Sequence, residues 1–486
     1  MEEITNTDNE IIPDGPPVQK HPLDDYYDRL KWLRSLITDP AGTYYFTEKT
    51  QLEYLKDYLK QINRTKAFLE LAGNPQEQYP VVHIAGTSGK GSVTTMIGAI
   101  LRQAGLRVGV HTSPYLQVCN EKLVTDDIMI SPQEFVELID EFRQIHRTFY
   151  QKAGEPLRYQ EAWACLMYMY FAKKQVDWAV VETALGGRYD PSNVVPSKLA
   201  IITNIALEHT PQLGTSLAEI ARHKAGIIKK GMPVITSEKS ARIVDIFAKE
   251  AIKNHSKLYK LDRDFSFKID KSDHTGLTIE VRTPFKTFNT FHINHTGTFN
   301  AINASAAVKA GEVLAKKYGV PITEEHIRAA LEGWGLPGRM ETVQQAPQVI
   351  LDSAHNPQKM HALVDTIKAV FPQKSITVVI GMLAFKDVDA ILKALLPIAS
   401  HVIATQANVL GKPSLPTSDL KKAIFRQNPS LEVIECSSVK SGIEAALSKA
   451  KPDELVLITG SMYLIGEARE HWFNSEQMLI DLEGDR

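Results

Sequence analysis

The sequence has few cysteines and no long apolar segment, and each absence excludes a class of protein. Only three cysteines, Cys119, Cys165 and Cys436, occur in 486 residues. Their wide spacing suits neither a disulfide framework nor a zinc cluster, so we expect free thiols in a reducing compartment. No apolar run approaches the ~18 residues of a membrane-spanning helix, and the acidic, polar N-terminus is unlike a signal peptide. We therefore expect a cytoplasmic protein without a membrane partner.

The sequence also lacks an excess of either charge. Lys and Arg total 55 and Asp and Glu total 57, which gives a formal net charge of −2. This balance gives no support to a nucleic-acid partner. Hydrophobic residues make up 43% and charged residues 23%, as in ordinary globular proteins. Because the length exceeds that of one typical core, we expect two domains.

Alternating strands and helices predict an α/β fold for the first domain, residues 23–335. The preceding residues 1–22 hold few core-forming side chains and four prolines, and we expect a disordered tail there. Period-two patterning over 257–295 predicts an antiparallel flap, and a long helix is expected near 300–317. Short β-rich segments that predict a mostly parallel sheet lie at 81–85, 178–183, 199–205 and 233–236.

A Gly/Pro cluster at 333–339 marks the end of this domain and the start of a smaller one, residues 336–486. Apolar segments alternate there with helical segments, which predicts a second, Rossmann-like α/β domain. No G-x-G-x-x-G fingerprint is present in it, so a dinucleotide cofactor is not expected. The expected strands lie within 349–355, 376–383, 401–407, 431–437 and 454–461.

The stretch Val81–Ser92, VVHIAGTSGKGS, is the strongest functional signal. It predicts a strand, a glycine turn and a helix that begins near Ser92, an arrangement that binds phosphate groups at the helix N-terminus. Lys90 would place a charge on the phosphates and the Ser92 hydroxyl would ligate Mg²⁺. A glycine-rich turn without a ligand is the alternative. The expected nucleotide contacts are Gly86, Thr87, Ser88, Gly89, Lys90, Gly91 and Ser92.

Two further strands end in candidate metal ligands. Glu182 closes one strand and His209 follows the next, so both would lie at the edge of the sheet that borders the binding crevice. A carboxylate at the end of a buried strand requires a nearby cation, which here would be Mg²⁺. A hydrogen-bonded structural histidine is the alternative for His209.

Lys224 falls on the apolar face of a helix expected over 215–229. Either its ammonium extends along the surface to solvent, or burial lowers its pKa and leaves a neutral, nucleophilic amine. The apolar residues that define this face are Leu217, Ile220, Ala221 and Ile228.

G-T-S-G-K-G-S resembles the nucleotide loop of the Mur ligase superfamily and, within it, of the folylpolyglutamate synthase/dihydrofolate synthase family. The resemblance extends over residues 55–470, because further segments follow in the family's order. These segments are HTSPYLQVCNE, VETALGGRYDPSNV, ITNIALEHT, RHKAGIIKKG, LPGRME, LDSAHNP, GMLAFKD and TGSMYLIGEAR.

The resemblance implies an ATP-dependent ligase that adds L-glutamate to the γ-carboxylate of a (tetrahydro)folate through an acyl phosphate. The alternatives are a bifunctional enzyme that also makes dihydrofolate, a Mur-type amide ligase with another acceptor, a phosphotransferase or regulatory NTPase, and a non-catalytic nucleotide-binding module. The implied cofactors are ATP and two Mg²⁺ ions. The implied partners are the small-molecule substrates folate, L-glutamate and ATP, and a monomer is expected.

The resemblance also implies roles for individual residues, including a Lys224 carbamylated by CO₂. Lys90, Glu182, His209 and Lys224 would be catalytic. The metal ligands would be Ser92, Ser113, Glu182, His209 and Lys224. Further nucleotide contacts would come from Asn303, Arg339, Asp352 and His355. Substrate contacts would come from Ser113, Pro114, Tyr115, Glu161, Gly187, Arg188, Tyr189 and Asp190.

Three positions depart from the family's pattern. Glu208 stands where an Asp usually precedes the histidine, and Phe299-Asn300 stands where His-Gln is usual. The segment Asp39–Gln51 does not show the dihydropteroate-contacting sequence of bifunctional members. We therefore expect weak dihydrofolate synthase activity.

Overall fold

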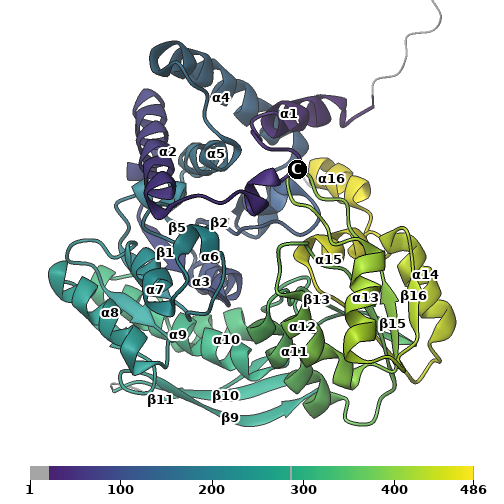
Figure 1. Cartoon of the computed structure of the whole chain (residues 1–486). Coiled ribbons are helices and arrows are strands. Elements are labelled where there is room, and N and C mark those ends of the chain that lie inside the picture. The colour runs from purple at the N-terminus through teal and green to yellow at the C-terminus, as the bar shows by residue number, and fades with distance from the viewer. Residues whose placement is uncertain (1–20, 285–286, 485–486) are drawn as a thin grey trace, which may run out of the picture.

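Three sheets organise the part of the chain that the structure, a computed structural model, describes: residues 21–284 and 287–484 (Figure 1). The largest sheet has the order β4-β3-β2-β5-β1-β6-β7-β8 and is parallel from β2 to β8. Its strands are β1 (Val81–Ala85), β2 (Val108–His111), β3 (Val124–Thr125), β4 (Ile128–Met129), β5 (Trp178–Glu182), β6 (Leu199–Ile202), β7 (Val234–Thr236) and β8 (Leu258–Lys260). Nearly all of the predicted tail, 1–22, lies outside the described residues.

Both faces of this sheet are covered by helices because side chains alternate along each buried strand. In β1, Val82 and Ile84 pack with α3, α9 and α10, whereas Val81 packs on the opposite side with α1, α2, α4 and α5. The helices of this region are α1 (Asp24–Arg34), α2 (Gln51–Leu71), α3 (Lys90–Gln103), α4 (Pro132–Ala153), α5 (Tyr159–Lys173), α6 (Thr210–Leu213), α7 (Leu217–Ala225), α8 (Ala241–Lys253), α9 (Thr298–Tyr318) and α10 (Glu324–Glu332).

The predicted flap is confirmed as an antiparallel sheet with the order β11-β10-β9. Its apolar side chains, such as Leu277, Ile279 and Phe291, pack with α9 and α10 in the same core as β1. In Figure 1 this sheet lies along the lower edge of the molecule, away from the carboxyl ends of the parallel strands. It therefore supports α9 rather than lining the cavity described below. The strands are β9 (Ser266–Asp273), β10 (Gly276–Arg282) and β11 (Thr287–Ile293).

The second α/β unit is confirmed as a six-stranded sheet with the order β12-β13-β17-β14-β15-β16. The five predicted strands are parallel, and an antiparallel edge strand, β12, was missed. The strands are β12 (Glu341–Gln345), β13 (Gln348–Asp352), β14 (Ile376–Ile380), β15 (His401–Ala404), β16 (Val433–Glu435) and β17 (Leu455–Thr459). The helices are α11 (Pro357–Val370), α12 (Val388–Leu395), α13 (Thr417–Gln427), α14 (Val439–Lys449), α15 (Met462–Arg469) and α16 (Ser475–Gly484). The α/β fold class is thus confirmed, while the domain boundary at residue 335 stays a prediction.

Two helices differ in detail from the sequence-based expectation. α3 begins at Lys90, two residues before Ser92, so the lysine itself stands in the first helical turn. In α2, the spacing of Leu52, Leu55, Leu59 and Ile62 predicts an amphipathic helix, but Leu52 and Leu59 are exposed, at 60% and 47%. The buried side of α2 carries Tyr54 and Tyr58 instead. No helix within the described ranges is long and apolar enough to cross a membrane.

Candidate active site

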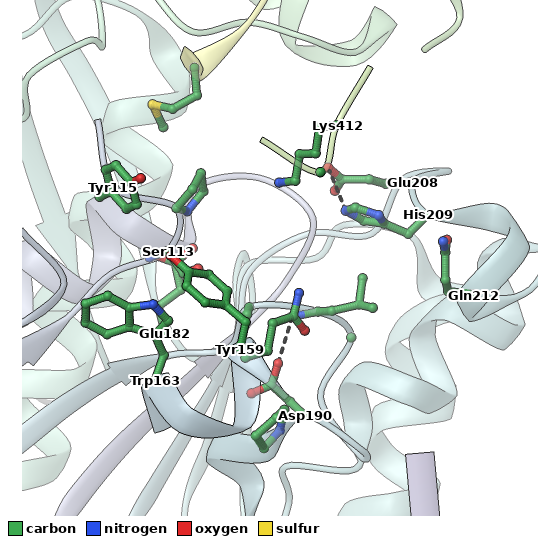
Figure 2. Close-up of a pocket in the computed structure, with 18 of the residues that line it drawn as sticks. Ser113, Tyr115, Tyr159, Trp163, Glu182, Asp190, Glu208, His209, Gln212 and Lys412 are labelled. Atoms are coloured by element: carbon green, nitrogen blue, oxygen red, sulfur yellow. Dashed lines mark hydrogen bonds and ion pairs between the residues drawn. The ribbon is translucent and has the colours of Figure 1, made fainter. Parts of the chain in front are cut away.

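The carboxyl ends of the central parallel strands open onto a cavity of about 690 Å³. Parallel strands present their loops at one edge, which is where ligands bind in open α/β sheets. The lining comes from both regions of the chain: the loops after β1, β5 and β6 on one side, and those after β14, β15 and β17 on the other. Figure 2 shows part of this lining, with Glu182 and Ser113 on one side, Glu208 and His209 on another, and Lys412 reaching in between.

The loop after β1 is held in shape by its own contacts. A Cβ at Gly86, where φ is +149°, would collide with Thr203 Oγ1, so this position requires glycine. Asn204 accepts from the Ser88 N–H through its side chain at 2.8 Å, and Thr203 Oγ1 donates to the Ser88 carbonyl at 2.6 Å. The loop therefore presents the first N–H groups of α3 to the cavity without rearrangement. Its cavity-lining residues are Thr87, Gly89, Lys90, Gly91 and Ser92.

Glu182 is a buried carboxylate beside this loop. Lys90 Nζ lies 3.6 Å from its Oε1, and the Ser113 N–H donates to Oε2 at 3.2 Å. A Cβ at Gly91 would lie 3.3 Å from Oε2, so the carboxylate lies beside Gly91, next to Ser92. Burial raises the pKa of Glu182 above its usual range, although Lys90 favours the ionised form. The carboxylate is therefore incompletely compensated, as expected for a group that binds a further cation.

Lys224 points toward the nucleotide loop, not toward solvent. Its side chain is 3% exposed, and Nζ donates to the Gly86 carbonyl at 2.5 Å. Burial, assisted by the nearby positive charge of Lys90, lowers the pKa of Lys224 to about 7. Of the two readings of this residue, the structure supports the buried amine of reduced basicity and contradicts the surface-directed ammonium.

His209 directly precedes the short helix α6 and lies beside Glu208 instead of Glu182. Its Nε2 is 3.7 Å from Glu208 Oε1, and the same oxygen lies 3.5 Å from His355 Nε2 of the C-terminal region. Lys359 Nζ is 3.2 Å from His355 Nε2. Burial lowers the pKa values of His209 and His355 to about 3, so both imidazoles are neutral at pH 7. The structure does not place the His209 and Glu182 side chains next to each other. Figure 2 shows them on different sides of the pocket.

The remaining nucleotide-site candidates divide between the cavity and the layer behind it. Arg339 and His355 line the cavity, and the Arg339 guanidinium donates to Ser353 Oγ. Asn303 lies behind the loop, where its side chain occupies the space that a Cβ at Gly89 would need. The Asp352 carboxylate accepts from the N–H groups of Met340 and Ala354, at 3.0 and 2.9 Å. Burial raises its pKa, and it stabilises the turn after β13.

Of the predicted substrate residues, Ser113, Pro114, Tyr115, Tyr189 and Asp190 line the cavity. The Asp190 carboxylate accepts from the Leu185 N–H at 2.7 Å and from Ser192 N at 3.0 Å, and so shapes the loop after β5. In Figure 2 it lies at the base of the pocket.

The other three substrate candidates do not reach the cavity, and each has a structural explanation. Glu161 is fully buried and receives two hydrogen bonds from Arg64, at 2.9 and 2.6 Å. Gly187 packs against the backbone of α7, where a Cβ would lie 3.0 Å from Lys224 Cα. Arg188 turns away and its Nη2 lies 3.1 Å from Glu250 Oε1. These placements correct the expectation that all three contact substrate.

Four cavity lysines were missed by the sequence analysis: Lys122, Lys359, Lys386 and Lys412. Lys122 Nζ donates to Ser113 Oγ at 3.3 Å, and burial lowers its pKa to about 8. Burial also lowers the pKa of Lys359 to about 7, although Glu208 opposes the shift. Lys386 lies within the segment GMLAFKD, but no local pattern predicts that these four lysines are neighbours, and only tertiary structure places them around one cavity.

Comparisons with known proteins agree with this architecture. Residues 84–311 match the family model "Mur ligase middle domain", and residues 338–462 match "Mur ligase, glutamate ligase domain". The dihydrofolate synthase/folylpolyglutamate synthase of Bacillus subtilis is 31% identical over 415 residues, covering 84% of this chain and 94% of that protein. The folylpolyglutamate synthase of Lacticaseibacillus casei is 32% identical over 411 residues, covering 84% of this chain and 93% of that protein.

Solved structures give the same result. Mycobacterium tuberculosis folylpolyglutamate synthase complexed with ADP and AMPPCP has a TM-score of 0.82 at 26% identity, covering 93% of this chain and 100% of that chain. An FPGS–AMPPCP–folate complex has a TM-score of 0.77 at 27% identity, covering 92% of this chain and 99% of that chain. Fold and site thus define an ATP-dependent ligase of the Mur ligase type. The chain belongs to the folylpolyglutamate synthase/dihydrofolate synthase family.

Proposed function

We propose that this chain is an ATP-dependent ligase that joins L-glutamate to the γ-carboxylate of a tetrahydrofolate. One observation carries the proposal: the nucleotide loop, Glu182 and loops of the C-terminal region all line the same cavity. A relative that aligns over 93% of its own length carries the name folylpolyglutamate synthase, and one neighbouring structure is a complex with AMPPCP and folate. In the reaction, the folate carboxylate attacks the γ-phosphorus of ATP and releases ADP. The amine of glutamate then displaces phosphate from the acyl phosphate and forms the amide.

The residues at the nucleotide loop suit the first step. The N–H groups at the start of α3 and the Lys90 ammonium would hold the phosphates, whose negative charge otherwise repels the attacking carboxylate. Arg339, from the other side of the cavity, would add a second positive charge. The neutral imidazole of His355 lies on the same side, where it would contact the nucleotide without repelling Lys359.

The side chains beside the loop also fit one Mg²⁺ ion. Ser92 and Glu182 offer oxygen donors, the ligand type that Mg²⁺ prefers, and phosphate oxygens with water would complete the shell. Within residues 21–284 and 287–484, no three His, Cys, Asp or Glu side chains gather as a metal cluster. A second ion would therefore depend on His209 and a carbamylated Lys224, because Ser113 lies on the side of Glu182 and would serve the first ion. When bound, the metal would screen the charge of the triphosphate.

We further propose that Lys224 reacts with CO₂ to form a carbamate. Only the neutral amine performs this addition, and a pKa of about 7 makes that form abundant near neutral pH. The product carries a negative charge, so it would attract a metal ion that the ammonium repels. Its position at the Gly86 carbonyl, beside the nucleotide loop, supports this role.

Mass spectrometry tests the proposed reaction directly. Tetrahydrofolate incubated with the protein, ATP, Mg²⁺ and L-glutamate should gain glutamyl units, with one phosphate released for each. ATP hydrolysis without any amino-acid requirement would instead indicate a regulatory NTPase. Turnover with a different carboxylate acceptor and none with any folate would reject the folate assignment.

Dihydropteroate is the second acceptor to compare. Asp39, Tyr44 and Tyr45 line the cavity, so the segment that departs from the family's pattern borders the space in which the acceptor would bind. We propose weak dihydrofolate synthase activity on this basis, although several relatives are named as bifunctional. Equal kcat/KM for dihydropteroate and tetrahydrofolate would contradict it.

We also propose a cytoplasmic monomer whose two domains, residues 23–335 and 336–486, close around the substrates. The cavity that both regions line supports closure. Light scattering after gel filtration would measure the mass, and small-angle scattering with and without nucleotide would measure closure.

A further inference from the structure

The segment between α1 and α2 crosses to the C-terminal region and fixes two of its loops. We call this segment, residues 39–45, the strap. The Gly411 N–H donates to the Pro40 carbonyl at 2.8 Å. A Cβ at Gly42, where φ is +71°, would lie 2.6 Å from Pro413 Cδ, so the strap and the segment around Pro413 are in close contact. The strap therefore holds the loop that carries Lys412.

Lys412 projects from this loop into the cavity (Figure 2). Its ammonium donates to Tyr463 Oη and lies 4.6 Å from the centre of the Tyr463 ring. Within the described ranges it forms no ion pair with a carboxylate. Its contacts thus orient the ammonium without neutralising it.

The charges that surround Lys412 are mostly positive. Lys122 and Lys386 line the same cavity, and the charge of Lys412 acts to lower the pKa of both. The imidazole of His209 is neutral and so adds no charge. The Glu208 carboxylate of the same cavity lies beside His209 and His355, at 3.7 and 3.5 Å, instead of forming an ion pair with Lys412. A half-buried cation among other cations is stabilised when an anion arrives.

We propose that Lys412 binds a carboxylate of a glutamyl group and that Tyr463 positions its ammonium. This inference rests on the proposed ligase function, which supplies two sources of that group: the incoming amino acid and the glutamyl end of the folate. In the proposed function the nucleotide loop, Lys90 and Arg339 hold the phosphates of ATP, so Lys412 is left for a different anion. Lys412 is therefore a specificity residue for the dicarboxylic substrate.

Steady-state kinetics of Lys412→Met and Lys412→Arg test the proposal. Loss of a charge-assisted hydrogen bond should raise one KM by about 10- to 100-fold in Lys412→Met. A rise in the KM for glutamate identifies the incoming amino acid as the ligand, and a rise in the KM for tetrahydrofolate identifies the acceptor. The KM for ATP should change less than about threefold, and Lys412→Arg should recover most of the loss because it keeps the charge. Tyr463→Phe should raise the same KM to a smaller extent.

The matched control is Lys440→Met, which removes an exposed lysine from α14 and should change no kinetic constant. Thermal melting of each variant separates loss of fold from loss of binding, and Lys412→Arg keeps the test available if Lys412→Met unfolds. Unchanged KM values for both glutamate and folate, or a rise confined to ATP, would overturn the inference. Absence of ligase activity in the wild-type protein would instead reject the proposed function itself.

Discussion

The rings of Tyr45 and Phe385 stack face to face, with centroids 3.9 Å apart and planes inclined by 3°. Tyr45 belongs to the strap, whereas Phe385 precedes Lys386 in the loop after β14. The stack therefore ties the N-terminal region to a loop that lines the cavity from the C-terminal region.

Removing this stack should loosen the cavity wall. We expect Tyr45→Ala to lower the free energy of unfolding by about 1–2 kcal/mol, since an aromatic pair adds to the area that it buries. It should also raise the KM for glutamate or folate several-fold, whereas Tyr45→Phe keeps the ring and should resemble wild type. Urea denaturation and steady-state kinetics measure both effects. Phe46→Ala, which removes a 61% exposed neighbour, is the control; an equal effect there would exclude a specific role for the stack.

Glu161 should be important for stability and not for substrate binding. Glu161→Ala would leave the Arg64 guanidinium, 5% exposed, without its main partner, and loss of one member of a buried ion pair costs about 3–5 kcal/mol. Urea denaturation should show this loss, while the folded fraction keeps its KM for folate. Glu155→Ala removes the exposed second partner of Arg64 and should cost less than about 1 kcal/mol. A large rise in the folate KM with little destabilisation would restore Glu161 as a substrate residue.

Gly86→Ala should abolish nucleotide binding without a comparable loss of fold. The added Cβ would collide with Thr203 Oγ1, and the loop would move away from the start of α3. Titration with a fluorescent ATP analogue should show at least a tenfold weaker affinity. Gly154→Ala is the control, because its φ is also positive, at +72°, but its Cβ meets open space. If both variants bind ATP normally, the loop geometry is not essential.

Lys224→Ala should lose most activity and recover part of it when acetate or another short carboxylate is added. Lys224→Arg keeps a positive charge that repels metal, so it should be inactive and not rescued. Isotopic labelling with ¹³CO₂ would detect the carbamate by NMR. Full activity in Lys224→Arg would exclude the carbamate.

The pKa of Lys224 also predicts the pH dependence of this modification. Because the pKa is lowered from 10.5 to about 7, the amine is mostly neutral at pH 8 and mostly protonated at pH 6. Activity that depends on added CO₂ should therefore fall as the pH drops through 7. If the pKa were unshifted, the fall would lie near 10.5 and carbamate would be scarce at pH 8. CO₂-depleted buffers at pH 6, 7 and 8 distinguish the two cases.

The sequence by itself determined the α/β architecture and the position of the nucleotide loop. The glycines at 86, 89 and 91 and the apolar strand at 81–85 act locally, since they fix backbone conformation and burial over a few residues. The apolar face around Lys224 likewise follows from helical spacing, but the sequence left two readings of that lysine open, and the structure supports the buried one.

Tertiary structure decided which polar groups meet. Arg64 and Glu161 pair across two helices, which removes the glutamate from the cavity, and Glu208 meets His355 from the other region of the chain. No local sequence pattern predicts such contacts, because the two residues of each pair are distant in sequence. The placement of Lys412 likewise depends on the docking of the strap against its loop. Burial and charge pairing are properties of the assembled fold, whereas glycine turns and strand periodicity are properties of the chain.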